Sequence, residues 1–541
     1  MKRRKFCPWS FAGALIFAAF SIIGMHFSSF GEKVGGFGNM ADLVKYLPVA
    51  IILTVFFYFI LYFLLNKKIC KKAETPDSKL WEFYEKHIFI ISFIVLIISW
   101  VPYMLCFYPG SVSHDGYKQI NQSMGIQPLT NQHPILGTYI IGFFFQIGSM
   151  VNDNFGVFLY ICFQVIASSA AFALSVSRIR KMGISLKGSA LAMTFFAVVP
   201  VWGMYEQAVV KDTLYTAVFV WFMVCFLSLA DEVLCDKKEK IEKKTILLFL
   251  ISAFLTCAIR QNGKFIVLPA AVFLTAVSLK KWKSMLAVLV IFLVLLSGYN
   301  KVIVPATGAE PISRRATYSV MFQQTAKYLW AYPEEVTEEE YETIDKVIDA
   351  DTIAEKYNPR LSDPVKDTFN NQTSNENVKE YLKVWYQMFW KHPGVYVEAF
   401  LQHCYGYLDP FHISAPVPIF QNYIKGAPIA TGDFDIHYTH GKAVRGRLTE
   451  YAMLWTRMFP LTLLIYPGVY TWITLFCILL LCKKRKWKQL SVMMIPVFII
   501  LTNMASPVNG CLRYTLPLMA VTPLLLAWII KETRISEERK S

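Results

Sequence analysis

The chain has 541 residues, of which 55% are hydrophobic, 15% aromatic and only 17% charged, and its mean hydropathy is +0.41. Because soluble proteins carry roughly a quarter charged residues, this composition excludes a string of soluble domains and indicates a polytopic membrane protein. The net charge of +16 is also typical of nucleic-acid-binding proteins, and the placement of the basic residues decides between the two interpretations.

Twelve apolar stretches have about the length of a helix that crosses a bilayer core, which takes about 20 residues. They lie at residues 10–30, 43–65, 87–108, 155–177, 189–205, 213–230, 245–259, 264–279, 284–303, 461–482, 489–505 and 513–531. The predicted fold class is therefore all-α, a polytopic membrane protein of about twelve transmembrane helices with a small extracytoplasmic domain.

The predicted organisation has four parts. Residues 1–86 hold an N-terminal pair of transmembrane helices, and the first of these is retained because no small-residue cleavage site follows it. Residues 87–303 form a transmembrane module with a first outer loop at 109–154. Residues 304–460 form an extracytoplasmic domain, and 461–541 form three transmembrane helices and a cytoplasmic tail.

The basic residues of the short connections lie almost entirely on one side of the predicted membrane. That side carries 31 of the 54 Lys and Arg residues, and the positive-inside rule makes it cytoplasmic together with both termini. The net charge then reports orientation, and no basic groove for nucleic acid is expected. The bilayer is the expected environment, and a bacterial plasma membrane the expected location.

The extracytoplasmic domain is predicted to be mainly helical. Thr337 and Glu340 have the spacing of a capping box, and an apolar helical face follows. A second helix carries Val378 to Phe389 on one face and breaks at residues 392–394. The domain is either a lid without chemistry of its own or a part of an active site.

The first outer loop carries the candidate catalytic residues His114 and Asp115. A carboxylate at the water boundary can accept a proton from an incoming hydroxyl. The alternative is that Asp115 caps the short helix predicted after it. Residues 134–150 are apolar, but the charge pattern places both of their ends outside, so we expect a re-entrant or interfacial segment opened by His133 and Pro134.

Cationic side chains recur at the outer ends of several predicted spans. Such residues suit a phosphate, which Arg binds with a two-pronged fork, or else they contact lipid headgroups. The candidate substrate- or phosphate-binding residues are Lys211, Asp212, Arg260, Asn262, Arg445 and Arg513.

A weaker candidate is a metal site before the last three spans. Asp433, Asp435 and His437 alternate, so an extended strand would aim them the same way, and His440 is a further ligand type. Chance composition of a hydrophilic loop is the alternative. No cofactor is required on this interpretation, and a divalent metal remains a minor alternative.

The order of these motifs resembles the GT-C superfamily of integral-membrane glycosyltransferases, specifically the branch of protein O-mannosyltransferases and lipid A aminoarabinose transferases. The resemblance rests on the outer-loop Asp115, on His133-Pro-Ile-Leu-Gly137, on Lys211-Asp212 and on the basic turn at Arg260. Ile135 departs from the second Pro that is usual in that branch. The outer segment is similar to an uncharacterised family of Gram-positive bacterial membrane proteins assigned to the same superfamily.

The resemblance implies a GT-C-like transmembrane module and a sugar donor on a polyprenyl phosphate. The implied acceptor is a cell-envelope glycan, lipid or protein, with Asp115 as general base and His133 orienting Asp115 or the sugar. The cations would then face Asp115 across the cavity and stabilise the leaving phosphate. A polysaccharide flippase or exporter without a catalytic base is the main alternative, and a polymerase or ligase that uses diphosphate-linked oligosaccharides is another.

Overall fold

The structure is a computed structural model that describes residues 6–29, 40–67, 78–235, 239–413 and 434–538. Within these residues the secondary structure is almost entirely helical. The sheet formed by this part of the chain consists of two parallel strands of two residues each, β1 (Ser111–Val112) and β2 (Ala208–Val209). The predicted helical class is confirmed.

Seven helical segments of the described chain are long and apolar enough to cross a membrane. They are Pro8–Ser28 (α1), Ala41–Asn66 (mainly α2, Leu47–Asn66), Lys79–Cys106 (α3), Asp153–Lys181 (α6), Lys211–Leu234 (α9), Leu279–Ala306 (around α12, Trp282–Gly298) and Leu512–Arg534 (within α23, Leu512–Glu538). An eighth is obtained if α7 (Leu186–Val198) and α8 (Pro200–Glu206), bent by 51°, count as one span. The chain is thus a multi-pass membrane-type helical protein.

The predicted number of twelve spans is not confirmed, because several predicted spans fall on short helices. These are α10 (Lys243–Ile259), α11 (Lys264–Ala276), α21 (Pro467–Lys483) and α22 (Leu490–Met504). At a rise of about 1.5 Å per residue, the 13 residues of α11 reach about 20 Å, which is less than a bilayer core of about 30 Å. Likewise, the segment predicted at 134–150 forms the short apolar helix α5 (Ile135–Ser149).

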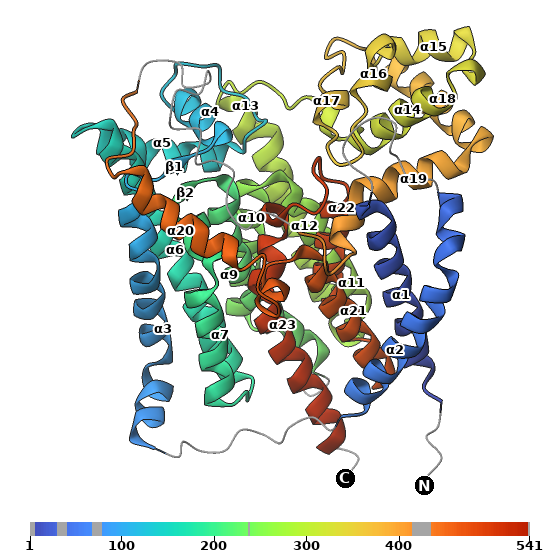
Figure 1. The fold of residues 1–541 in the computed structure, drawn as a ribbon. Coiled ribbons are helices and arrows are strands. Elements are labelled where there is room, and N and C mark those ends of the chain that lie inside the picture. Colours follow the sequence, from blue (N-terminus) through green and yellow to red (C-terminus); the bar gives the residue numbers. More distant parts are fainter. Residues whose placement is uncertain (1–5, 30–39, 68–77, 236–238, 414–433, 539–541) are drawn as a thin grey trace.

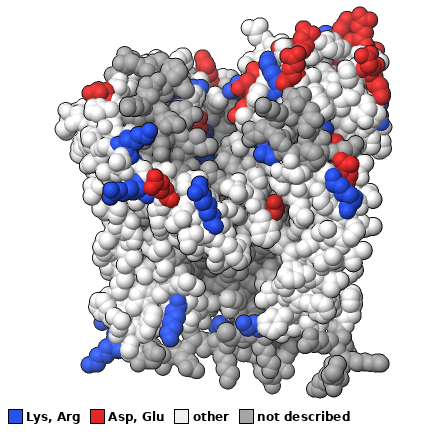
Figure 2. All heavy atoms as spheres, viewed as in Figure 1, with Lys and Arg blue, Asp and Glu red and all other residues white. Residues whose placement is uncertain are grey.

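The surface of the helical bundle matches a membrane environment. Figure 2 shows a broad white band in the lower half, between basic residues at the bottom and charges of both signs at the top. Helix α2 lies at the edge of the bundle (Figure 1) and exposes Ile52, Phe56, Phe59 and Phe63. A helix that is apolar on its exposed side cannot face water over this length, so this face is suited to lipid.

Helix α1 packs closely against its neighbours because of a small residue. A Cβ at Gly13 would lie 2.8 Å from the Leu61 side chain of α2 and would also overlap Leu479 of α21. Only glycine permits this approach. The N-terminal pair α1 and α2 is thereby attached to the C-terminal helices, although more than 400 residues separate Gly13 from Leu479.

Helix α9 is the centre of the bundle. Most of its residues are buried, including Phe219, Phe222 and Phe226, and it packs against α6, α10 and α23. Its first residues, Lys211 and Asp212, therefore stand at one end of the most enclosed helix of the protein.

The domain predicted to be extracytoplasmic is a separate helical unit at one end of the bundle (Figure 1). It contains α14 (Ser319–Ala331), α15 (Glu338–Asp345), α16 (Ala350–Lys356), α17 (Asp363–Lys366), α18 (Asn375–Lys391) and α19 (Pro393–Cys404). Its own core includes Phe322, Ile344, Tyr381 and Met388. The capping box at Thr337 is present, and α18 ends where the sequence predicts a break.

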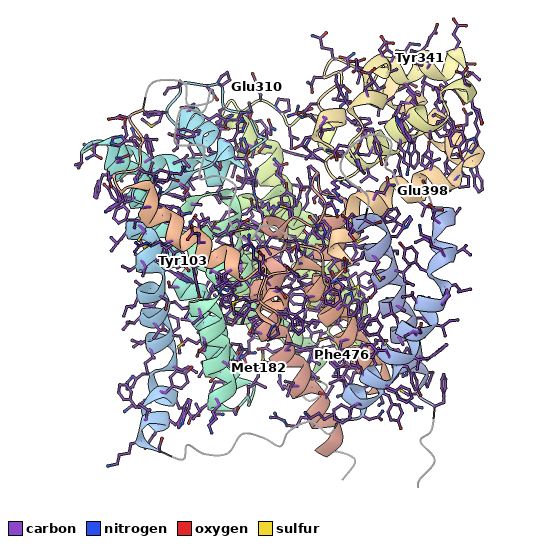
Figure 3. All side chains as sticks on the ribbon, viewed as in Figure 1. Tyr103, Met182, Glu310, Tyr341, Glu398 and Phe476 are labelled. Atoms are coloured by element: carbon purple, nitrogen blue, oxygen red, sulfur yellow. The ribbon has the colours of Figure 1, made fainter. Side chains whose placement is uncertain are left out.

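This domain and the chain ends mark opposite ends of the molecule. The start of α1 and the end of α23 lie at the bottom of Figure 1, and the domain lies at the top. Figure 3 labels Met182 toward the lower end and Glu310 and Tyr341 at the upper end. Below, "outer end" denotes the end that carries the domain.

Candidate active site

The two short strands bring distant segments of the chain together at the outer end. Ser111 pairs with Ala208 and Val112 with Val209, in parallel. Since parallel strands run in the same direction, the helices that follow them, α4 (His114–Ser123) and α9, begin side by side. Asp115 is therefore placed next to Lys211.

The start of α4 is fixed by Ser113. Its hydroxyl accepts a hydrogen bond from Gly116 N at 2.9 Å and donates one to Val209 O at 3.0 Å. Ser113 is thus the N-cap, and the alternative that Asp115 caps the helix is wrong. A Cβ at Gly116 would lie 2.6 Å from Val209 O, so glycine permits α4 to approach β2.

Asp115 makes two ion pairs through a single oxygen. Its Oδ2 lies 3.3 Å from Lys211 Nζ and accepts a hydrogen bond from Arg513 Nη2 at 2.9 Å. Its Oδ1 lies 3.8 Å from His114 Nδ1. The Asp115 side chain is 27% exposed, more than the Lys211 side chain (18%).

Asp212 joins two arginines from different helices. Arg513 Nε donates a hydrogen bond to Asp212 Oδ2, and Arg260 Nη1 lies 2.7 Å from Oδ1. The Asp212 side chain is fully buried. The Arg260 guanidinium also lies 5.2 and 5.4 Å from the ring centres of Tyr215 and Tyr514, which is within cation–π range. Asp115, Lys211, Asp212, Arg260 and Arg513 are called the charged cluster below.

The helical domain at the outer end holds the loop that leads to Arg513. His403 Nε2 lies 2.6 Å from Ser506 O, and Gly406 N donates to Asn509 Oδ1 at 2.8 Å. Tyr407 Oη accepts a hydrogen bond from Cys511 N at 3.1 Å. The domain therefore fixes the chain just before Arg513, which goes beyond a passive lid.

His133 lies behind Lys211. Its Nδ1 is 3.3 Å from Lys211 Nζ, and the residue is only 3% exposed. Burial, and then the charge of Lys211, lower the pKa of His133 to about 3. The imidazole is therefore neutral at physiological pH and accepts a hydrogen bond from Lys211. Its buried Nε2 makes no hydrogen bond within the described part of the chain.

Asp115 is ionised in this arrangement. Burial acts to raise the pKa of its carboxyl group, but the Lys211 charge, the His114 hydrogen bond and the Arg513 charge outweigh it and hold the pKa well below its usual range. A carboxylate stabilised to this degree binds a proton weakly. It must lose part of this stabilisation before it can act as an effective base.

The expected separation of base and cations is wrong for this structure. We expected the cations to face Asp115 across a cavity, whereas Lys211 and Arg513 contact it directly. Among the described residues of the cluster, the three cations outnumber the two carboxylates, so Asp115 contacts cations that Asp212 alone does not neutralise. Arg260 reaches Asp115 only indirectly, through Asp212 and Arg513.

Two other predicted residues lie near the cluster without joining its ion pairs. Asn262 is on the turn Gln261–Gly263, where Gln261 Nε2 donates to Asn131 O at 2.5 Å. Arg445 is on α20 (Lys442–Leu454) and stacks on the Tyr438 ring, 3.9 Å from its centre. Asn262 therefore adjoins a residue that bonds the first outer loop, and Arg445 stacks on the tyrosine that bonds Ser111.

The predicted metal ligands do not assemble in the described residues. Asp435 Oδ1 is 3.0 Å from His437 Nδ1, and His440 Nδ1 is 3.1 Å from Thr439 Oγ1. Across the described ranges, no group of three or more His, Cys, Asp or Glu residues could hold a metal ion. Asp433 lies outside the described residues.

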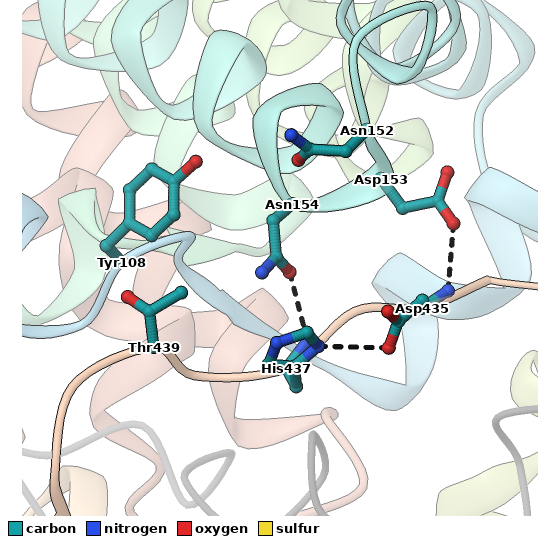
Figure 4. A pocket seen from close by; sticks show the side chains of 7 residues that line it. All are labelled: Tyr108, Asn152, Asp153, Asn154, Asp435, His437 and Thr439. Carbon is teal, nitrogen blue, oxygen red and sulfur yellow. Dashed lines mark hydrogen bonds and ion pairs between the residues drawn. The ribbon is translucent and has the colours of Figure 1, made fainter.

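The segment around Asp435 instead lines a pocket at the start of α6 (Figure 4). The pocket has a volume of about 410 Å³ and shares no residue with the charged cluster. Asp435 N donates to Asp153 Oδ2 at 2.8 Å, and His437 N donates to Asn154 Oδ1 at 3.0 Å. The lining residues are Tyr108, Asn152, Asp153, Asn154, Asp435, His437 and Thr439.

Sequence reasoning missed the side chains that surround the cluster. Tyr215 lies one helical turn after Lys211, so helical spacing could have identified it. Tyr514 directly follows Arg513, and helical spacing does not bring neighbouring residues to one face. Tyr438 donates or accepts a hydrogen bond with Ser111 at 2.7 Å. No local signal in the sequence links these two residues, which are 327 positions apart.

Residues 125–541 match a family described only as a family of unknown function (DUF6020). The match covers more than half of the chain, so the chain belongs to this family. No curated protein and no solved structure matches the chain.

Proposed function

We propose that this member of the family is an integral-membrane glycosyltransferase that moves a sugar from a polyprenyl-phosphate donor to a cell-envelope glycan, lipid or protein. The observation that carries the proposal is the charged cluster itself. It combines a solvent-accessible carboxylate, Asp115, with three cations, Lys211, Arg260 and Arg513, at one end of the helical bundle.

The reaction assigned to the cluster is a displacement at the anomeric carbon. The acceptor hydroxyl oxygen forms the new bond to that carbon, and its proton passes to Asp115. The bond between the anomeric carbon and the phosphate oxygen breaks, its electron pair stays on the oxygen, and polyprenyl phosphate leaves. No cofactor or metal takes part in this scheme.

The net positive charge of the cluster matches the negative charge of the phosphate before and after the transfer. With both carboxylates ionised, its three cations and two anions sum to one positive charge. A sugar phosphodiester donor carries one negative charge. When Asp115 takes the proton the cluster gains a second positive charge, and the leaving phosphate monoester approaches two negative charges. Stabilisation of charge where it develops is the main catalytic effect of such sites.

The remaining residues have supporting roles in this proposal. Asp212, fully buried between Arg260 and Arg513, is a positioning residue rather than a second base. His133 orients Lys211 through its neutral ring. The apolar helices accommodate the polyprenyl tail, and the distribution of basic loops supports a bacterial plasma membrane with both termini in the cytoplasm and the cluster outside.

The resemblance of the outer-loop Asp115, His133-Pro134 and Lys211-Asp212 motifs to the GT-C superfamily supports the same assignment. The net charge of the cluster supports a monophosphate donor over a diphosphate donor. A diphosphate leaving group carries more negative charge than the cluster can match.

The test is transfer from a radiolabelled polyprenyl-phosphate sugar by purified protein in lipid nanodiscs. Asp115→Asn should keep the protein folded and lower the transfer rate by about 10²–10⁴-fold, the usual contribution of a general base. Asp367→Asn, an exposed carboxylate on the extracytoplasmic domain paired with Arg315, is the matched control and should retain full activity. Full transfer activity of Asp115→Asn would overturn the assignment of Asp115 as the base. Translocation of lipid-linked sugar by the wild type without transfer would overturn the glycosyltransferase assignment in favour of a flippase.

A further inference from the structure

Asp115 rests on the same two cations that the proposed function assigns to the donor phosphate. Lys211 and Arg513 both approach its Oδ2, at 3.3 and 2.9 Å. An ammonium and a guanidinium group can bind a phosphate oxygen in the same way as they hold this carboxylate oxygen. The carboxylate and a phosphate cannot occupy this place together.

Each of the two cations has a further contact besides Asp115. Arg513 is held through its Nε by Asp212, while it uses Nη2 for Asp115. Lys211 is held by His133 Nδ1 at 3.3 Å. Each cation therefore has a second, independent contact, and the pair of cations remains a preformed anion site when the carboxylate moves away.

The two carboxylates of the cluster differ in their freedom to move. Asp212 is fully buried, engages Arg260 and Arg513 and lies at the start of the central helix α9. Asp115 is 27% exposed and lies in the first turn of the ten-residue helix α4. Rotation of the Asp115 side chain toward solvent breaks its ion pairs with Lys211 and Arg513 and its contact with the neighbouring His114. Asp115 is thus the anion that can exchange.

We propose that Asp115 occupies the place of the donor phosphate in the ligand-free protein, and that phosphate binding displaces it from Lys211 and Arg513 and frees it to accept the acceptor proton. This inference rests on the proposed function for the identity of the phosphate. The displaced carboxylate loses the cationic neighbours that keep it ionised, so it becomes a stronger base only when the donor is bound. The exchange also explains why Asp115 contacts Lys211 and Arg513 directly in this structure. For sugar transfer, Asp115 must leave these cations so that it can accept the proton of the acceptor.

The exchange makes an unusual prediction for binding. Removal of a catalytic carboxylate usually weakens or leaves unchanged the binding of substrate, but here Asp115 competes with the ligand. Asp115→Asn, which keeps the shape and removes the charge, should bind farnesyl phosphate at least tenfold more tightly than the wild type. Lys211→Gln should bind it at least tenfold more weakly, since it removes a cation from the same place.

The experiment measures the binding of farnesyl phosphate to full-length protein in phosphatidylcholine nanodiscs. Farnesol, which lacks the phosphate, should bind wild type and Asp115→Asn equally. Asp367→Asn, which removes an exposed carboxylate of the extracytoplasmic domain, should bind farnesyl phosphate as the wild type does. Inorganic phosphate and nanodiscs that contain phosphatidylglycerol distinguish a free anion and a general lipid headgroup from a polyprenyl phosphate.

A second variant and a wild-type measurement protect the test against misfolding. Asp115→Ala should show the same gain in affinity if Asp115→Asn does not fold. In the wild type, difference infrared spectra should show a shift of a carboxylate band when farnesyl phosphate is added, and this shift should be absent from Asp115→Asn. Equal or weaker binding by both variants, or no carboxylate shift in the wild type, would overturn the proposal.

The proposal and the proposed function fail in different ways. If Asp115→Asn loses transfer without a gain in phosphate affinity, the glycosyltransferase assignment stands and the exchange is wrong. If Asp115→Asn gains affinity and retains transfer, the exchange stands and Asp115 is not the base.

Discussion

Removal of the Asp212 carboxylate should destabilise the protein more than removal of any other charge in the cluster. Asp212 is fully buried, and its two oxygens engage Arg513 and Arg260 separately. Asp212→Asn keeps the volume of the side chain but leaves two guanidinium groups near each other without their shared anion.

The magnitude follows from the burial of the pair. Loss of one partner of a buried ion pair costs about 3–5 kcal/mol, because the other charge stays buried and uncompensated. Asp115→Asn changes the net charge of the cluster by the same amount, but Asp115 is 27% exposed, and the cations it leaves each keep another contact, Lys211 with His133 and Arg513 with Asp212. We expect it to cost about 1 kcal/mol or less. Comparison of the two variants thus separates the effect of burial on stability from the effect of the change in net charge.

The assay is unfolding of full-length protein in mixed micelles of increasing denaturing detergent, followed by intrinsic fluorescence, with wild type, both single variants and Asp212→Asn/Arg513→Gln. The double variant should recover stability relative to Asp212→Asn alone, because one of the stranded cations is gone. A coupling free energy of about 1–3 kcal/mol is expected for residues in direct contact.

Two results would refute this reasoning. Equal losses for Asp212→Asn and Asp115→Asn would show that burial does not set the cost. A double variant that loses the sum of the single losses would show that Arg513 and Asp212 do not stabilise each other.

Two further predictions concern the geometry and the protonation of the site. Gly116→Ala should lower transfer at least tenfold and cost about 1–3 kcal/mol, because its Cβ would meet Val209 O at 2.6 Å; Gly394→Ala, with open space around it, should be neutral in both the transfer and unfolding assays. His133→Gln should make the free energy of unfolding fall less steeply as the pH is lowered. The pKa of His133 is lowered to about 3 in the folded protein by burial and by Lys211, against about 6.5 when unfolded, so its contribution is complete above pH 6.5 and is lost by about 1.4 kcal/mol per pH unit below it. Unfolding between pH 4.5 and 7 measures this, and parallel profiles for wild type and variant would contradict it.

The sequence was sufficient for features that depend on local pattern. The helical membrane class follows from apolar length and composition, and the capping box at Thr337 follows from residue spacing. Sorting the loops by basic content also identified Asp115, Lys211, Arg260 and Arg513 as one set, since charged residues at span ends on one side of a membrane share a small volume of space.

The sequence was insufficient for features that depend on long-range contacts. Strands of two residues, such as β1 and β2, carry no periodicity, so the pairing that aligns Asp115 with Lys211 had no local signal. Arg513 and Asp212 are 301 positions apart. The predicted twelve spans are not confirmed, because hydropathy does not report how long the helix within an apolar stretch is, as the 13 residues of α11 illustrate.

The composition of the charged cluster itself argues for a ligand. A set of ion pairs that served only stability would balance its charges, because each unmatched buried charge carries a desolvation cost. Here the three cations exceed the two carboxylates, and Lys211, Arg260 and Arg513 are each less than one-fifth exposed. Asp212 is positioned to hold two of these cations permanently, whereas Asp115 shares its single oxygen between Lys211 and Arg513 and remains accessible to water. One fixed anion, one more exposed anion and an excess cation support the proposed binding of a negatively charged ligand. We propose a lipid phosphate because the surrounding helices are suited to lipid.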